Sequence, residues 1–135
     1  MNSSDQDINK ILTTSKTIAV VGLSDNPERD SYGIAAYLKA QGYCIIPVNP
    51  NATQILGEKS YPDLKSIPEK VDLVNIFRKP EAIPNIVDEA IQIGAKAVWM
   101  QLGIVHLEAA EKARKAGLQV VMDKCIAVEH RVLCQ

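Results

Sequence analysis

Short apolar runs alternate with helix-like segments along almost the whole chain. The first run, Thr17–Val21, is continuous, rich in β-branched residues and ends at Gly22, as expected of a strand buried on both faces of a parallel sheet. Similar runs occupy residues 43–48, 72–77, 95–101 and 118–122. Between and around them, the spacing of apolar residues predicts helices near residues 5–15 and over 31–40, 83–93, 107–116 and 125–132.

This alternation predicts an α/β fold: a Rossmann-like, doubly wound sheet of five parallel strands with helices on both faces. Numbering the strands along the chain, we expect the order 3-2-1-4-5. Residues 51–70 show no periodicity and are expected to be irregular. We expect one domain over residues 1–135, with an N-terminal helix in residues 1–15 and a core over 16–131.

Composition argues against several classes of function. The net charge is −1, so no broad basic surface indicates nucleic acid or an anionic membrane as partner. The N-terminus lacks the pattern of a signal peptide, and no apolar run reaches the length of a membrane span. The three cysteines stand too far apart for a disulfide framework or a zinc site. We therefore expect a cytoplasmic protein with reduced thiols and no metal.

The loop after the first strand is the strongest candidate for a binding site, because ligands of open parallel sheets lie beyond the carboxyl ends of the strands. Gly22 allows close approach of a ligand, Ser24, Asn26 and Ser31 offer donors, and Arg29 adds a positive charge. A helix beginning near Ser31 would add unpaired N–H groups and the positive end of its dipole. The loop therefore predicts a diphosphate site. The alternative is an ordinary strand-to-helix connection.

The residues around this loop favour coenzyme A over NAD or FAD. The dinucleotide motif needs G-x-G-x-x-G and, about 20 residues later, an acidic side chain for the ribose. Here Gly22-Leu23-Ser24 lacks the second glycine, and the second strand ends at Val48-Asn49-Pro50 without a carboxylate. A carboxylate there would also repel a 3′-phosphate. An NAD(P)-dependent reductase with an atypical loop remains an alternative.

Several short segments together resemble the small stand-alone CoA-binding proteins. They span residues 16–131 in the order expected of that family. The segments are Val20-Val21-Gly22-Leu23-Ser24 with Pro27, Ser31-Tyr32 and Tyr37-Leu38; Pro47-Val48-Asn49-Pro50; Phe77-Arg78; Trp99-Met100-Gln101-Leu102-Gly103; and Val121-Met122-Asp123 with Cys125 and Glu129-His130. The family is similar to the N-terminal domain of the succinyl-CoA synthetase α subunit.

This resemblance implies that the chain binds coenzyme A or an acyl-CoA. It implies that the first loop holds the diphosphate, that residues 49–50 lie by the adenosine, and that residues 77–78 and 101–103 follow the rest of the ligand. The histidine that carries the phosphoryl group in the synthetase lies in a second domain without a counterpart here, so ligase activity is not implied. The predicted ligand-binding residues are Gly22, Leu23, Ser24, Asn26, Pro27, Arg29, Ser31, Tyr32, Gly33, Asn49, Pro50, Phe77, Arg78, Gln101, Leu102, Gly103 and Cys125.

The sequence predicts no catalytic residue. His106 stands near a helix start, where a capping or solvated role is more common than catalysis, and His130 is expected on the surface or in packing. Trp99 and Met100 lie in a predicted buried strand and are expected in the core. We expect a CoA-binding protein that acts as carrier, sensor or partner of an acyl-CoA enzyme. An acyltransferase or thioesterase is the alternative.

Cys125 follows the fifth strand and opens the last predicted helix. If the pantetheine arm of CoA crosses the strand ends, its thiol comes near this side chain, and the two thiols can form a mixed disulfide under oxidising conditions. The alternative is a small residue that packs the last helix. Cys44, inside the second predicted strand, is expected to be inert.

Overall fold

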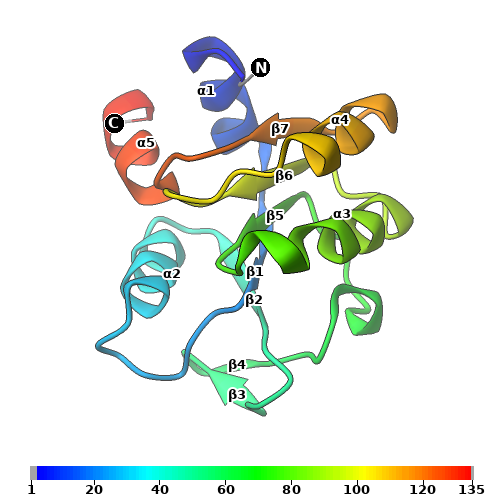
Figure 1. Cartoon of the computed structure of the whole chain (residues 1–135). Helices are drawn as coiled ribbons and strands as arrows, with labels where there is room; N and C mark the ends of the chain where they lie inside the picture. Colours follow the sequence, from blue (N-terminus) through cyan, green and yellow to red (C-terminus); the bar gives the residue numbers. More distant parts are fainter. Residues whose placement is uncertain (1–2, 135) are drawn as a thin grey trace.

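The computed structural model describes residues 3–134, which form one parallel sheet with helices on both faces (Figure 1). The strands of this sheet are β1 Thr17–Val21, β2 Cys44–Val48, β5 Leu73–Ile76, β6 Ala97–Met100 and β7 Gln119–Val121. They pair in parallel in the order β2-β1-β5-β6-β7. The α/β class, the five parallel strands and the place of each strand in the sequence are thus confirmed.

The strand order differs from the expected one. In chain order it is 2-1-3-4-5, because β5 pairs with the free side of β1 and leaves β2 at the edge. Pro47 explains the edge position: it has no N–H for a second neighbouring strand, and its carbonyl oxygen accepts a hydrogen bond from Tyr61 N at 3.0 Å on the outer side. The point at which the strand order reverses therefore lies between β1 and β5, not between the first and fourth strands as expected.

The helices form two layers around the sheet (Figure 1). Their bounds are α1 Asp5–Thr14, α2 Asp30–Ala40, α3 Ile83–Gln92, α4 Leu107–Lys115 and α5 Ile126–Leu133, with short 3-10 helices η1 Leu64–Ser66 and η2 Pro80–Ala82. Leu12, Leu38 and Ile126 bring α1, α2 and α5 onto one face. Val87 and Ala110 bring α3 and α4 onto the other.

The middle of the sheet is fully buried. Trp99 and Met100 in β6 are 0% exposed, which confirms that they belong to the core. The indole Nε1 of Trp99 donates a hydrogen bond to the Lys124 carbonyl oxygen at 2.8 Å. This bond fixes the loop that follows β7 against the sheet.

Part of residues 51–70, expected to be irregular, forms a small hairpin. The strands β3 Gln54–Ile55 and β4 Glu58–Lys59 pair in antiparallel register. Leu56 and Gly57 turn the chain with φ of 55° and 76°, the left-handed conformations of a type I′ turn. A leucine rarely adopts this conformation, so the sequence did not indicate the turn.

Within residues 3–134, no helix combines the length and the apolar character needed to span a membrane.

Candidate ligand-binding crevice at the strand ends

Gly22, at the end of β1, is required by the contact between two strand ends. Its φ is +84°, and its N–H donates to the Val48 carbonyl oxygen at 2.9 Å. A Cβ on this residue would collide with the Phe77 carbonyl oxygen and approach Arg78 Cδ to 2.9 Å. Only glycine therefore lets the chain leave β1 so close to the end of β5.

The loop after Gly22 is fastened by its own polar side chains. Ser24 N donates to Ser31 Oγ and Asn26 N donates to Ser24 Oγ, both at 3.0 Å. Glu28 N donates to Asn26 Oδ1 at 3.0 Å. These three side chains were expected as donors to a ligand, yet each accepts a bond within the loop. Because a hydroxyl that accepts still has a hydrogen to donate, Ser24 and Ser31 retain that capacity.

The helix after this loop begins one residue earlier than expected. Arg29 is the N-cap of α2 and makes no side-chain capping bond, whereas Ser31, where the helix was expected to begin, lies within its first turn. Arg29, Glu28 and Asp30 are exposed and border one open hollow of about 380 Å³. We call it the loop cavity; its lining is Gly22, Ser24, Glu28, Arg29, Asp30, Ser31 and Phe77. The two carboxylates oppose the positive charge of Arg29 at the helix start.

Asn49 joins the end of β2 to the loop after β1. Its Nδ2 donates to the Leu23 carbonyl oxygen at 3.0 Å, and its Oδ1 accepts from Asn51 N at 2.8 Å. Leu23 itself is fully buried in the core that α2 covers. The side chains of these two predicted residues thus serve the protein's own packing.

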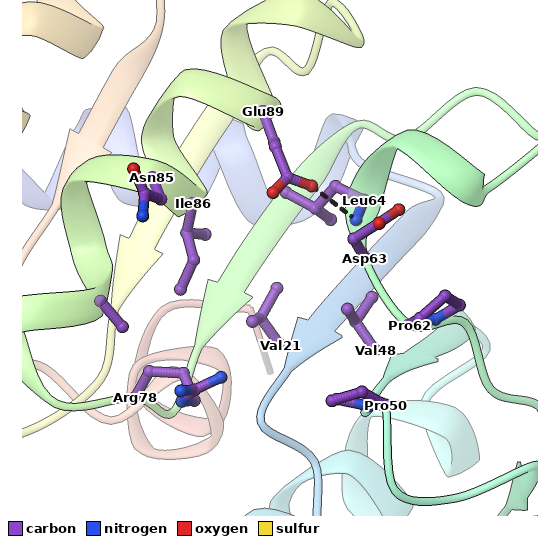
Figure 2. Close-up of a pocket in the computed structure, with 11 residues that line it drawn as sticks. Val21, Val48, Pro50, Pro62, Asp63, Leu64, Arg78, Asn85, Ile86 and Glu89 are labelled. Atoms are coloured by element: carbon purple, nitrogen blue, oxygen red, sulfur yellow. Dashed lines mark hydrogen bonds between the residues drawn. The ribbon is translucent and has the colours of Figure 1, made fainter.

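A second cavity, of about 230 Å³, lies between the ends of β1 and β2, η1 and α3 (Figure 2). We call it the α3 cavity. Figure 2 shows the predicted residues Pro50 and Arg78 on one side and Asn85, Ile86 and Glu89 of α3 on the other. Glu89 Oε1 accepts a hydrogen bond from Leu64 N at 3.0 Å. Asn85 and Glu89 were not among the predicted residues, although two polar residues four positions apart on a helix, beside an isoleucine, are a pattern visible in the sequence.

A third cavity, of about 220 Å³, lies at the same edge of the sheet, beside the loop cavity. We call it the β6 cavity. Its lining is Asp30, Ile34, Phe77, Gln101, Leu102, Ile104 and Cys125. Phe77 and Asp30 line both this cavity and the loop cavity, so the two adjoin. The sequence did not single out Ile34 or Ile104.

The structure brings most of the predicted residues to one edge of the sheet. Ten of them line one or more of the three cavities: Gly22, Ser24, Arg29, Ser31, Pro50, Phe77, Arg78, Gln101, Leu102 and Cys125. The others lie outside these linings: Leu23, Asn26, Pro27, Tyr32, Gly33, Asn49 and Gly103.

Both histidines have structural contacts. His106 is the N-cap of α4, and its Nδ1 accepts a hydrogen bond from Ala109 N at 3.1 Å, as expected of a cap. His130 is buried on α5, where its Nδ1 lies 2.8 Å from the Tyr37 hydroxyl. Burial lowers the pKa of His130. Neither histidine lines the three cavities.

Cys125 is the N-cap of α5, half-buried in the wall of the β6 cavity. Cys44, by contrast, is exposed, because it is the first residue of the edge strand β2. Its place in a strand therefore does not shield Cys44, so the expectation that this thiol is inert loses its structural basis. Cys134 is half-buried near the end of α5, and burial raises the pKa of its thiol.

Comparison with known proteins identifies the family of this chain. The family model "CoA binding domain" matches residues 16–131. The Bacillus subtilis protein YneT, described as uncharacterized, is 43% identical over 131 residues and 97% of both chains. The Archaeoglobus fulgidus acetate–CoA ligase (ADP-forming) II is 37% identical over 83 residues, 60% of this chain but 12% of that enzyme. A Pyrococcus horikoshii hypothetical protein is 43% identical with a TM-score of 0.95, over 98% of this chain and 94% of that one. This chain therefore belongs to the family of CoA-binding domains.

Proposed function

We propose that the protein binds coenzyme A across the carboxyl edge of its sheet. The diphosphate lies in the loop cavity, the adenosine toward Pro50 and Arg78, and the pantetheine arm passes Phe77 toward the β6 cavity. The observation that carries the proposal is the continuity of the loop cavity and the β6 cavity through Phe77 and Asp30. A polar hollow at a helix start that adjoins a largely apolar one suits a ligand with an anionic half and an uncharged arm.

Two further features support CoA over a nicotinamide dinucleotide. The end of β2 carries Asn49 and Pro50 in place of the carboxylate that would bind a ribose diol. Asn49 is moreover engaged with the loop after β1 through its bond to the Leu23 carbonyl oxygen. Arg29 and Arg78 are exposed, Arg29 in the lining of the loop cavity and Arg78 in that of the α3 cavity, and they supply positive charge for phosphate groups.

The relatives suggest the biochemical context in which this protein binds CoA. The acetate–CoA ligase of Archaeoglobus fulgidus matches this chain over only a small part of its length. We propose that this protein likewise works beside an acyl-CoA enzyme, in the reduced cytoplasm, and supplies or holds the CoA without chemistry of its own.

The test is a comparison of ligands by calorimetry and melting temperature. CoA at 100 times its dissociation constant should stabilise the protein by about 2.7 kcal/mol, a melting shift on the order of 10 °C for a chain of this size. NAD at the same concentration should give a smaller shift. A clear shift with NAD beside none with CoA or acetyl-CoA would overturn the proposal. Incubation with acetyl-CoA, followed by assay of free thiol, tests in the same samples for thioester hydrolysis.

A further inference from the structure

We propose that the β6 cavity receives the acyl group of a short-chain acyl-CoA, so that the protein prefers a thioester to free CoA. The inference rests on the proposed function and adds the class of ligand: CoA thioesters with a small, uncharged acyl chain. The cavity lies next to the loop cavity, where the diphosphate is proposed to bind, and it opens on the same edge of the sheet.

The lining of the β6 cavity is mainly apolar. Ile34 on α2, Phe77 after β5 and Ile104 after β6 are all partly buried and face it from three elements. Leu102 at its rim is 66% exposed, so a ligand there would cover apolar surface that water now contacts. An apolar cavity of about 150 Å³ holds benzene, so one of about 220 Å³ accommodates an acyl chain of a few carbons.

Gln101 gives this apolar wall one oriented polar group. Its Oε1 accepts hydrogen bonds from Ile126 N at 3.3 Å and from Asn75 Nδ2 at 3.2 Å. Because a backbone N–H can only donate, the atom that faces Ile126 must be the oxygen, and this fixes the orientation of the Gln101 amide. Its amino group is then left as the donor that Gln101 can offer to a carbonyl oxygen. A thioester has such an oxygen, whereas the free thiol of CoA does not.

The protein keeps the Gln101 amide in this orientation at a cost in folding stability. Asn75 is 0% exposed, and its Oδ1 has no hydrogen-bond partner within residues 3–134. The Asn75 amide cannot simply turn over, because its oxygen would then face Gln101 Oε1. An unpaired buried acceptor destabilises a fold, so the pair is better explained by the orientation it imposes on Gln101 than by stability.

The walls of the cavity are held by bonds from neighbouring loops. Asp123 Oδ1 accepts from Gly103 N at 2.7 Å, and Asp123 N donates to the Ile104 carbonyl oxygen at 3.2 Å. These bonds connect the segment after β6 to the segment after β7. A wall fixed in this way should discriminate acyl chains by length.

The experiment is a calorimetric series with CoA, acetyl-, butyryl-, hexanoyl- and palmitoyl-CoA. Each methylene buried in the cavity should raise affinity about fourfold, until the chain no longer fits and the gain stops. Palmitoyl-CoA should gain nothing over hexanoyl-CoA. Equal affinity for CoA and all the thioesters would overturn this inference and leave CoA binding intact, whereas failure of every ligand to bind would overturn the proposed function.

Substitutions inside and outside the β6 cavity test where the acyl chain binds. Ile34→Phe should fill the cavity and abolish the gain from the acyl chain, so that this variant binds CoA and the acyl-CoAs with equal affinity. Ile91→Phe, a matched change of a partly buried isoleucine on α3 at the other face, should keep the gain. Gln101→Glu retains the acceptor for Ile126 N but removes the amino donor, so the ratio of acyl-CoA to CoA affinity should fall. If Ile34→Phe folds and keeps the full acyl gain, the acyl group lies elsewhere and the inference is wrong.

Discussion

The Tyr37 hydroxyl on α2 lies 2.8 Å from Nδ1 of His130 on α5. The ring of Tyr43 packs edge-on against the same imidazole, with centroids 5.8 Å apart, and the guanidinium of Arg131 lies 4.6 Å from the centre of the Tyr37 ring. These contacts hold α5 against α2. Because α5 begins beside Cys125 in the wall of the β6 cavity, they also help to position that wall.

The burial of His130 makes the stability of the protein depend on pH. Burial lowers the pKa of His130 below its ordinary value of 6.5, so the folded state favours the neutral ring and the unfolded state binds the proton more readily. The free energy of unfolding should therefore be at its full value above pH 6.5 and decline as the pH falls below it.

Urea denaturation of the wild type and of His130→Gln across pH 5 to 8 measures this contribution. The variant should lose the part of the pH dependence that lies just below pH 6.5. An identical pH profile in the two proteins would show that His130 does not contribute it.

Replacement of Gly22 should lower the stability of the fold itself, in addition to any effect on ligand binding. Gly22→Ala places a side chain at φ +84° and against the Phe77 carbonyl oxygen, so we expect a loss on the order of 1–3 kcal/mol in the free energy of unfolding. Gly33→Ala is the matched control, because Gly33 lies inside α2 with open space around its Cα. That change should stabilise by about 0.5–1 kcal/mol. Equal melting temperatures for wild type and Gly22→Ala would contradict the steric argument.

The charges at the start of α2 should act in opposite directions on CoA. Arg29→Ala should weaken binding about two- to fivefold and reduce its dependence on salt, since Arg29 is exposed in the loop cavity. Asp30→Asn should strengthen binding by a similar factor, because it removes a carboxylate from the same cavity. Lys115→Ala, an exposed change at the end of α4, is the control and should have no effect. If the Arg29 and Asp30 variants both bind like the wild type, the diphosphate does not lie in this loop.

Cys125 should exchange with CoA disulfide more readily than with glutathione disulfide, because binding of the CoA moiety would bring the disulfide to the β6 cavity. In the exchange, the Cys125 thiolate attacks one sulfur, forms the mixed disulfide and releases one CoA thiolate. Intact mass spectrometry should show an adduct that is lost on reduction and absent from Cys125→Ser.

The exposed Cys44 provides the internal comparison, since it should react with both disulfides at similar rates. The hypothesis of a mixed disulfide between Cys125 and bound CoA would be refuted by an adduct confined to Cys44 or Cys134. It would also be refuted if Cys125 showed no preference for CoA disulfide.

The local pattern of residues predicted the elements well. Five apolar runs and the helical spacing between them place the strands and helices within about two residues of their observed bounds. The spacing of apolar residues distinguishes a helix from a strand. Because this spacing is a property of short stretches of sequence, it can be recognised without knowledge of the fold. The polar loop after β1 was recognisable for the same reason.

The strand order and the cavities were decided by contacts between residues far apart in the chain. Pro47 could have indicated that β2 is an edge strand, but the pairing of β1 with β5 depends on how both faces of the sheet are covered. Ile34 and Ile104 meet in one cavity only because α2 and the β6 loop lie at the same edge of the sheet. Likewise, nothing local to Gln101 shows that Asn75 and Ile126 orient its amide. The sequence by itself thus determined the elements and the loop expected to bind phosphate, whereas tertiary packing decided which side chains line the crevice and which are occupied in holding it together.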